Sequence, residues 1–255
     1  VADEQVVLSR PADYFNFFIV SSITLSDDNP VDITVSDVKP AFINHVLPLQ
    51  KGIIMFSDNG QFILFTESDI FSPKTARLKK LSSYDCDPTL QPVDLGTSIL
   101  FTSTVSAYTR AYEALIQDDD TAPQILEQTR VVPEYVPKDI TLAKNSTSLG
   151  VVTFGKKGSS VLYHFKHFDA GRGREQTAWY SWTVQGTIQH FLYTSGSLYT
   201  VTLHGSDYIL SRHEYITDAT SGRTYVLGGV AADVGSPLKT ARWFEPCLDS
   251  MTIPT

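Results

Sequence analysis

The sequence has little of what marks disulfide-stabilised, membrane-spanning or phosphate-gripping proteins. Its 255 residues include two cysteines, Cys86 and Cys247, which form neither a disulfide framework nor a closely spaced pair of metal ligands and which fit synthesis in a reducing compartment. No apolar run approaches the roughly 18 residues of a membrane span. The formal charge of −8, from 20 basic and 28 acidic residues, argues against a surface that grips nucleic acid through its phosphates, but not against a wall past which DNA slides.

The chain also lacks an initiator Met and a signal peptide, and a strand-like segment, Gln5–Leu8, comes almost at once. We therefore expect it to be a piece of a longer polypeptide. Its length suits one large all-β domain or two smaller ones, and we interpret residues 1–255 as a single all-β region.

Motifs of catalysis and ligand binding are incomplete. Gly150–Lys157 nearly spells a phosphate-binding Walker loop, but Lys157 stands where the Mg²⁺-binding Ser or Thr belongs, and a strand follows where a helix should begin. The acidic run Asp27–Asp32 lacks the Gly and Glu of an EF-hand loop. His164 and His167, three apart on an expected strand, point to opposite faces and cannot share a metal ion. We therefore expect no catalytic residue, cofactor or metal site, and no enzyme.

The clearest structural signal is the stretch Lys51–Glu67. It predicts two strands, Ile53–Ser57 and Gln61–Thr66, joined by a type I′ turn at Asn59-Gly60. Both faces of this hairpin are apolar, whereas a sheet with one face in water alternates apolar and polar residues. Because the chain offers few convincing helices, we expect other sheets to cover both faces, as in a propeller of stacked small sheets or in a multi-sheet sandwich.

Similar strand-forming segments recur along the chain. Four of them lie within about 45 residues, close to the length of a four-stranded propeller blade, and glycine-containing turns separate those after residue 140. The sequence thus predicts an all-β fold of β-propeller-like stacked antiparallel sheets, closed or incomplete. The remaining strands are expected at Phe42–Leu49, Ala76–Ser82, Val93–Leu95, Ser98–Thr102, Ala107–Leu115, Leu149–Phe154, Ser160–Phe168, Thr177–Val184, Ile188–Thr194, Ser197–Leu203 and Tyr208–Tyr215, with one or two more after Thr217.

Residues 118–140 interrupt this pattern. Acidic residues and a proline precede a possible helical turn, which predicts a short helix near residues 121–130. The prolines at 133 and 137 forbid both a helix and a central strand, so the segment is expected to be a helical and Pro-rich insertion.

Several segments, taken in order, resemble the tail tubular protein B family, which forms the nozzle of short-tailed, T7-like bacteriophages. The likeness runs from about Gln5 to at least Tyr215. No single motif is highly specific, but their order is. The residues that carry the resemblance are Ser9, Arg10, Asp13, Tyr14, Asn16, Phe17, Asp28, Pro30, Asp32, Pro133, Tyr135, Pro137, Gln176, Trp179 and Trp182, along with Leu47–Leu49 and Ile54–Phe62.

The resemblance implies a structural virion protein of the phage tail, made in the host cytoplasm. It implies a propeller-like subunit of a hexameric ring beneath the tail adaptor protein, whose lumen conducts double-stranded DNA on ejection and whose outer wall helps to seat the tail fibres. The acidic charge fits such a conduit, because a negatively charged wall repels DNA and cannot trap it during passage.

The family residues have structural readings as well. Trp179 and Trp182 lie three apart on an expected strand and therefore face opposite ways, one in the core and the other against a neighbour. The cluster Asp13–Phe17 suits a corner that joins blades or domains, and alternatively a recognition surface.

Two other functions remain open from the sequence. One is a propeller that binds or cleaves glycans, such as a phage depolymerase, which would need a pair of carboxylates about 5 to 10 Å apart in a pocket. The other is a bacterial surface propeller used for adhesion, against which the lack of a signal peptide argues.

Overall fold

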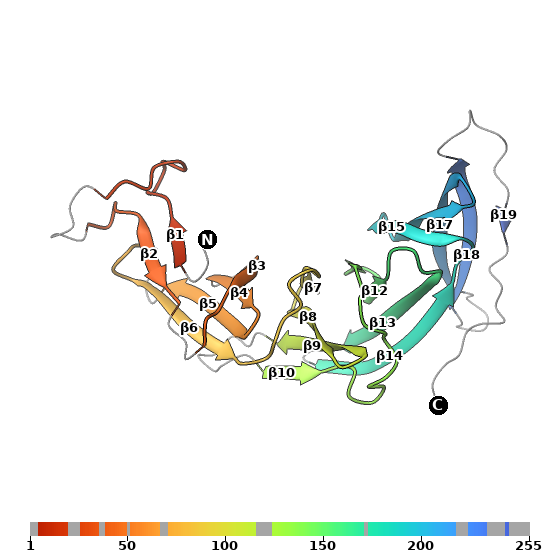
Figure 1. Cartoon of the computed structure of the whole chain (residues 1–255), viewed down its shortest axis with the longest axis horizontal. Coiled ribbons are helices and arrows are strands. Elements are labelled where there is room, and N and C mark those ends of the chain that lie inside the picture. Colours follow the sequence, from red (N-terminus) through yellow and green to blue (C-terminus); the bar gives the residue numbers. More distant parts are fainter. Residues whose placement is uncertain are drawn as a thin grey trace. The chain divides into compact units, whose positions relative to one another are not determined.

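The computed structural model describes residues 5–19, 26–35, 39–49, 52–66, 71–115, 124–170, 173–217, 224–233 and 243–244. Throughout these ranges the regular elements are β-strands, with no helix (Figure 1). The prediction of an all-β fold is confirmed. The chain divides into two compact units, the first made of Val1–Pro92, Phe101–Ser103 and Ala114–Leu126, and the second of Val93–Leu100, Thr104–Glu113 and Glu127–Thr255.

A two-stranded ribbon and a four-stranded sheet make up most of the first unit. In the ribbon, β1 (Gln5–Leu8) and β2 (Val31–Thr34) are antiparallel, with Leu8 opposite Val31 at one end and Gln5 opposite Thr34 at the other. The sheet is an antiparallel meander of β3 (Ile43–Leu49), β4 (Gly52–Ser57), β5 (Gly60–Thr66) and β6 (Ala76–Ser82).

Three more sheets follow, and in each of them every strand neighbours the next one along the chain. The first, whose residues are divided between the two units, has β7 (Val93–Asp94), β8 (Ser98–Val105), β9 (Tyr108–Leu115) and β10 (Gln124–Glu127). The second, antiparallel, has β11 (Leu142–Ser146), β12 (Val151–Gly155), β13 (Val161–Ala170) and β14 (Gly173–Thr183). The third, also antiparallel, has β15 (Thr187–Thr194), β16 (Ser197–His204), β17 (Asp207–Thr217), β18 (Thr224–Asp233) and β19 (Trp243–Phe244).

The β4–β5 hairpin is buried on both faces, as its sequence predicts. On one face, Met55, Phe62 and Leu64 form a core cluster with side chains of the β1–β2 ribbon, Val6 and Val31 among them. This face is thus covered by a second sheet, because the ribbon has its own apolar side turned toward it.

The opposite face of the hairpin carries Ile54 and Phe56, both completely buried. The ring of Phe56 packs against that of Phe101 in β8, with 5.3 Å between the ring centroids. Gln61, paired with Phe56 across the strands, is also buried and donates from Nε2 to the carbonyl of Tyr84 over 2.9 Å. Side chains from outside the β3–β6 sheet therefore cover this face too.

The turn of this hairpin differs from its prediction. Ser57 pairs with Gly60, so the two loop residues are Asp58 and Asn59, and none of Asp58, Asn59 and Gly60 has a positive φ. The Ser57 hydroxyl closes the turn by donating to the Gly60 carbonyl over 2.8 Å, which removes the need for a type I′ geometry. Gly60 is required for a different reason, because a Cβ there would lie 2.6 Å from the carbonyl oxygen of Ser82.

The helix predicted near residues 121–130 is also wrong where the structure describes it. Gln124–Glu127 forms β10, a strand at the edge of the β7–β10 sheet, and residues 121–123 lie outside the described residues. The segment is too short for a stable isolated helix, whereas β9 offers it backbone partners. The Gln128 amide donates to the Ala111 carbonyl over 2.8 Å, and Nη1 of Arg110 lies 2.9 Å from Oε1 of Glu127.

Besides β10, two further strands are present that the sequence did not predict. β2 directly follows the acidic turn that ends at Pro30, and its residues alternate between buried Val31 or half-buried Ile33 and exposed Asp32 or Thr34. β11 reads Leu-Ala-Lys-Asn-Ser and has almost no apolar pattern, because it is the edge strand of its sheet and pairs only with β12 there.

A buried histidine links the two large sheets of the second unit. The Thr153 hydroxyl in β12 lies 2.8 Å from Nδ1 of His164 in β13 and 2.6 Å from the hydroxyl of Tyr193 in β15. The His164 ring stacks on Tyr180 and packs against Trp182, at centroid distances of 4.9 and 4.0 Å. Nε2 of His164 is buried and has no hydrogen-bond partner among the described residues. This environment can hold a neutral imidazole but offers nothing that stabilises its charged form.

The pKa values follow from this burial. Desolvation, together with the nearby His213, lowers the pKa of His164 to about 3. Burial also lowers the pKa of His213 to about 4, with Nε2 of His213 lying 3.0 Å from the Thr200 hydroxyl. Both rings are thus neutral in the folded protein at pH values where an unfolded chain would protonate them.

We expect Phe56→Ala to lower the free energy of unfolding by about 3–5 kcal/mol, because it leaves a cavity on a fully buried face of the hairpin. Phe15→Ala is the matched control, because Phe15 in the same unit is 95% exposed and should change stability by no more than about 0.5 kcal/mol. Denaturant unfolding monitored by circular dichroism measures both. Equal losses in the two variants would contradict the burial of the hairpin's second face.

We expect the free energy of unfolding to fall as the pH is lowered from 6.5 toward 4, because the unfolded chain protonates His164 and His213 in this window and the folded chain does not. The two rings together contribute a slope of roughly 3 kcal/mol per pH unit near pH 5. In His164→Phe, which keeps an aromatic ring, the slope should drop by about half of this. Parallel pH profiles for the wild type and the variant would contradict a neutral, buried His164.

Candidate functional site

Aromatic side chains project into solvent from the loop that joins β1 to β2. Tyr14 is 79% exposed and Phe15 95% exposed, and Phe17, Phe18 and Ile19 are exposed as well. We call residues 14–19 the aromatic loop. Single exposed apolar side chains are ordinary, but a contiguous apolar group of this size marks a surface that contacts another molecule.

Hydrogen bonds fix the backbone of this loop. The Arg10 amide donates to the Asn16 carbonyl over 2.9 Å, and Nδ2 of Asn16 donates to Oδ2 of Asp13 over 3.0 Å. Oδ1 of Asn16 then accepts from the Phe18 amide over 3.0 Å. Nε of Arg10 donates to the carbonyl of Asp28 over 2.9 Å, which ties the loop's two ends together. The sequence-predicted residues Arg10, Asp13, Asn16 and Asp28 therefore act as the scaffold that presents the aromatic rings.

The rest of this predicted group lies nearby with simpler roles. Ser9 follows β1 directly, and Pro30 precedes β2 and is buried. Asp32 in β2 is exposed and accepts a 2.7 Å hydrogen bond at Oδ1 from Nε2 of Gln5, across the ribbon. The nine residues between Ser9 and Asp32 that carry the family resemblance thus all belong to the β1–β2 ribbon or to the loop between its strands.

A cleft of about 260 Å³ opens beside the other end of the ribbon. Ile33 and Thr34 of β2 line one side, and side chains of β5 and β6 line the rest, namely Phe62, Ala76, Arg77, Leu78 and Lys80. Phe62 and Ala76 are buried, and the two charged side chains of the lining, Arg77 and Lys80, are both basic. The ammonium of Lys80 lies 5.9 Å from the centre of the Phe62 ring, a cation–π distance. We call this the basic cleft.

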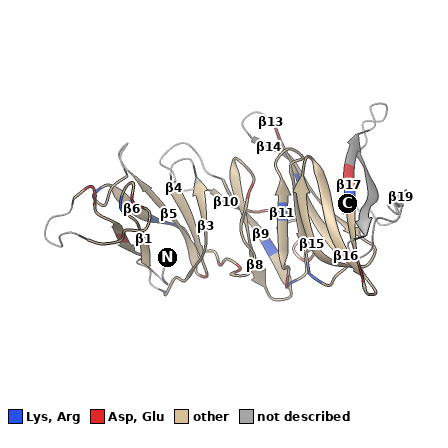
Figure 2. Cartoon of the chain, turned by 90° about the horizontal axis from the view of Figure 1, so that it is seen from above, with Lys and Arg blue, Asp and Glu red and all other residues tan. Residues whose placement is uncertain are grey.

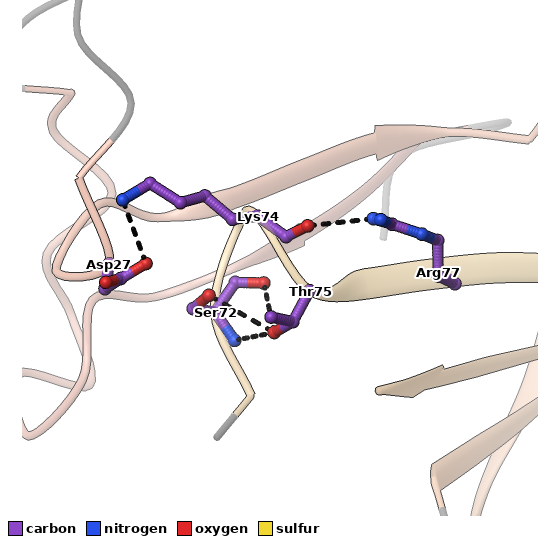
Figure 3. A network of polar contacts seen from close by, with 5 residues as sticks. All are labelled: Asp27, Ser72, Lys74, Thr75 and Arg77. Carbon is purple, nitrogen blue, oxygen red and sulfur yellow. Dashed lines mark hydrogen bonds and ion pairs between the residues drawn. The ribbon is translucent and has the colours of Figure 1, made fainter. Parts of the chain in front are cut away.

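The turn before β6 holds one rim of the basic cleft in place (Figure 3). Ser72 and Thr75 close the turn, with the Ser72 amide donating to Oγ1 of Thr75 over 3.0 Å. Nη1 of Arg77 donates to the carbonyls of Lys74 and Ala76 over 2.9 and 3.1 Å, so the guanidinium is oriented by the backbone. Lys74 in turn lies 3.3 Å from Oδ1 of Asp27, in a bridge exposed enough to add little stability.

The second predicted group assembles inside the second unit. Trp179 in β14 is buried, stacks on Phe154 at 5.8 Å, and lies edge-on to Tyr135 at 6.5 Å. Its indole Nε1 donates to the carbonyl of Gln128 over 3.0 Å. Pro137 forms a bridge with Tyr108 at the start of β9, and Pro133 lies in the turn just before Tyr135. These residues pack together in the interior of the second unit and do not form an accessible site.

The remaining two family residues are separate from that joint. Gln176 is exposed in β14, opposite Phe168 and next to an irregularity in strand register. Trp182 contacts His164 and lies 6.4 Å from His213, on the other face of β14 from Trp179. The two tryptophans therefore pack in different clusters, as the alternation of a strand requires.

Groups that could carry chemistry are held in unreactive settings. Burial, with Asp87 nearby, raises the pKa of the Cys86 thiol to about 12, so the thiolate nucleophile is not formed at neutral pH. Glu113 is completely buried and accepts hydrogen bonds from Ser98 Oγ and, over 2.6 Å, from Nε2 of Gln128. Among the described residues, no three His, Cys, Asp or Glu side chains gather closely enough to hold a metal ion.

The near-Walker segment is a hairpin connection. β12 ends at Gly155, a turn covers 156–160, and β13 begins at Val161, so a strand follows as predicted. The amide of Gly158 donates to the Ile188 carbonyl over 2.8 Å and is not directed toward a phosphate. Over the described ranges there is also no helix with the length and apolarity of a membrane span.

The sequence analysis missed the basic cleft and singled out only part of the aromatic loop. The signal for the cleft was the run Arg77 to Lys80 on a strand that otherwise alternates with apolar residues, in a chain that is acidic overall. Phe18 and Ile19 lie outside the predicted cluster Asp13–Phe17, so their exposure could be recognised only once the loop was placed.

Comparison with known proteins matches the order of segments noted above. The sequence pattern of the family described as "Bacteriophage nozzle protein" matches residues 1–227. The tail tubular protein gp12 of Escherichia phage T7 is 26% identical over 221 residues, which cover 85% of this chain. The same residues cover 27% of the length of that relative, so the chain spans about a quarter of it. The predicted family is confirmed.

Family membership also settles the class of the protein, which is a structural protein of the phage tail and thus of the virion. A match over residues 1–227 exceeds half of the chain by a wide margin. The chain therefore belongs to the bacteriophage nozzle protein family.

Proposed function

We propose that this chain is a wall segment of the tail nozzle, in a ring of subunits whose lumen conducts double-stranded DNA during ejection. The observation that carries the proposal is the family match over residues 1–227, together with the tail tubular relative in phage T7. The ring is hexameric, it lies beneath the tail adaptor protein, and its outer wall helps to seat the tail fibres. The chain has no catalytic part in ejection.

A propeller-like stacking of sheets is part of this proposal. The sheets β11–β14 and β15–β19 are consecutive meanders, as propeller blades are. Within the second unit, the first strand of one sheet contacts the first strand of the next, because β11 lies against both β7 and β15. Nδ2 of Asn145 in β11 donates to the Asp94 carbonyl in β7 over 2.5 Å. Neighbouring blades of a propeller meet in this way near the central axis.

The charge of the chain supports passage of DNA rather than its retention. Figure 2 shows that most positions along the strands hold neither a basic nor an acidic residue. The formal charge of −8 repels phosphates, so a wall made of such chains would not release counterions by binding DNA. A smooth, repulsive lining lets a duplex of any sequence slide, which is what ejection of a genome requires.

No observation favours the glycan-binding or glycan-cleaving alternative. Its chemistry would need two carboxylates facing each other in a pocket, and the completely buried Glu113 is hydrogen-bonded to Ser98 and Gln128 instead. The match to a structural tail family gives the adhesion alternative no support either.

We expect the full-length gene product that contains this chain to form six-fold rings with a central hole. Negative-stain microscopy and native mass spectrometry of the purified protein measure the symmetry and the number of copies. A stable monomer under both methods would contradict the proposal, and a screen for polysaccharide cleavage would then be the next step.

We also expect the protein to bind double-stranded DNA more weakly than the roughly 10⁻⁴–10⁻⁶ M typical of non-specific DNA-binding proteins at physiological salt. Fluorescence anisotropy with a labelled duplex measures this, and a lysine-rich histone serves as the positive control. Binding at micromolar concentration that weakens steeply with salt would contradict a repulsive wall.

A further inference from the structure

We propose that β14 pairs with a further β-strand, and that this strand comes from a part of the same full-length polypeptide outside residues 1–255. The added strand would extend the β11–β14 sheet from four strands to five, the number already present in the β15–β19 sheet. Only the choice of donor rests on the proposed ring, because the pairing itself follows from the backbone and the sequence of β14.

β14 is an edge strand, and the hydrogen bonds beside it show which way its backbone groups point. Among the described strands it pairs with β13 alone. The Val184 amide donates to the Ser160 carbonyl over 2.8 Å, one step beyond the pair of Thr183 and Val161. Hydrogen-bonded and non-hydrogen-bonded pairs alternate along an antiparallel ladder. Counting back from Val184, every second residue of β14 therefore points its amide and carbonyl toward β13.

The residues between these point their backbone groups out of the sheet. They are Thr177, Trp179, Ser181 and Thr183, and we call their outward amides and carbonyls the open edge. Within the described part of the chain, no hydrogen bond is made to these backbone groups. The open edge is about 20 Å long, at roughly 3.4 Å per residue. Donors and acceptors spaced in this way match the backbone of another extended strand.

The open edge lacks the features by which proteins prevent unwanted strand pairing. Such features are charged residues, prolines, irregular register and very short strands. From Gln176 to Thr183 the strand holds no proline and no charged residue, and its register with β13 is regular. The other described edges are protected: β6 carries Arg77, Lys79 and Lys80, β3 contains Pro48, β11 and β15 lie against each other, and β1, β2, β7, β10 and β19 have no more than four residues.

A second copy of the described strands is a poor donor. A ring of identical copies needs contacts between two unlike surfaces, and the described part of the chain offers no second unprotected edge to meet β14. Two β14 strands that paired with each other would make a two-fold contact, which closes after two copies and builds no ring.

The rest of the polypeptide is the better donor. In the T7 relative, the matched residues are 27% of the length, so most of that polypeptide lies outside the matched part. A strand from the same polypeptide is held at a high effective concentration, and it loses less entropy on pairing than a strand from a separate molecule.

Hydrogen exchange of the full-length protein, read at single amides by mass spectrometry with electron-transfer fragmentation, tests the pairing. We expect the amides of Thr177 and Thr183 to exchange at least about a hundredfold more slowly than in an unstructured peptide, as amides paired in a sheet do. Both side chains are exposed, so burial alone does not slow these amides. Ala178 and Tyr180, whose amides point toward β13, are the internal reference. Fast exchange along the open edge beside slow exchange at the reference would overturn the proposal.

Proline substitution gives a second readout. Thr177→Pro removes an amide that points out of the sheet, so it disturbs the added strand and not the ladder with β13. We expect it to speed exchange at Ser181 and Thr183 by at least about tenfold, because the added strand loses a hydrogen bond. The matched control, Ala178→Pro, removes an amide bonded to β13 and should lower the urea midpoint of unfolding more than Thr177→Pro does. Unchanged exchange in Thr177→Pro would contradict a paired edge.

Photo-cross-linking identifies the donor. The full-length protein carries p-benzoylphenylalanine in place of Thr177, and unlabelled copies are assembled together with copies labelled with ¹⁵N. We expect cross-links from β14 to a segment outside residues 1–255, with both peptides of the same isotope. The same group in place of Val131, which is 90% exposed in a turn, is the control and should not cross-link to that segment. Cross-linked peptides of mixed isotopes would assign the strand to a neighbouring copy and overturn the choice of donor.

The proposed ring is tested separately on the same samples by native mass spectrometry. A monomer whose open edge is protected and whose cross-links join peptides of one isotope would contradict the ring and support the pairing of β14. A ring whose open edge exchanges fast would support the ring and overturn the pairing.

Discussion

The requirement that governs this structure is that its central hairpins are apolar on both faces and must be covered on both. In the first unit, the β1–β2 ribbon covers one face of the β4–β5 hairpin, and Phe101 packs on the other. The second unit meets the same requirement in β14, where Trp179 and Trp182 pack in separate clusters on opposite faces. A sheet that is apolar on both faces must pack against other parts of the protein on both sides. This requirement accounts for the series of successive meanders.

Aromatic side chains occur both in the interior of the protein and on its surface, where their roles differ. Aromatic rings fill the interior around Trp179, yet the aromatic loop holds Tyr14 and Phe15 in water on a scaffold of hydrogen bonds. A fixed, exposed apolar loop on an otherwise acidic chain has a cost in solubility and marks a surface that contacts another molecule.

Much of the fold was predictable because the alternation of apolar and polar residues and the turn residues between segments are local signals of β-strands. The positions of β4, β5 and β6 follow from apolar alternation, and the double-sided hairpin follows from its two apolar faces. Other features depend on partners that a local pattern does not contain. β11 is a strand because β12 pairs with it, Gln124–Glu127 extends because β9 is available, and the turn at Asp58 is closed by a serine hydroxyl. The cleft around Arg77 combines residues from three strands and has no signature in any one segment.

The central claim is that this chain forms part of the wall of a ring whose lumen conducts DNA. Electron cryo-microscopy of the assembled tail, at a resolution that shows side chains, tests it most directly. The account predicts copies arranged around a common axis, with more acidic than basic groups facing the lumen. A lumen lined by Lys and Arg, or copies that are not arranged around a common axis, would contradict it.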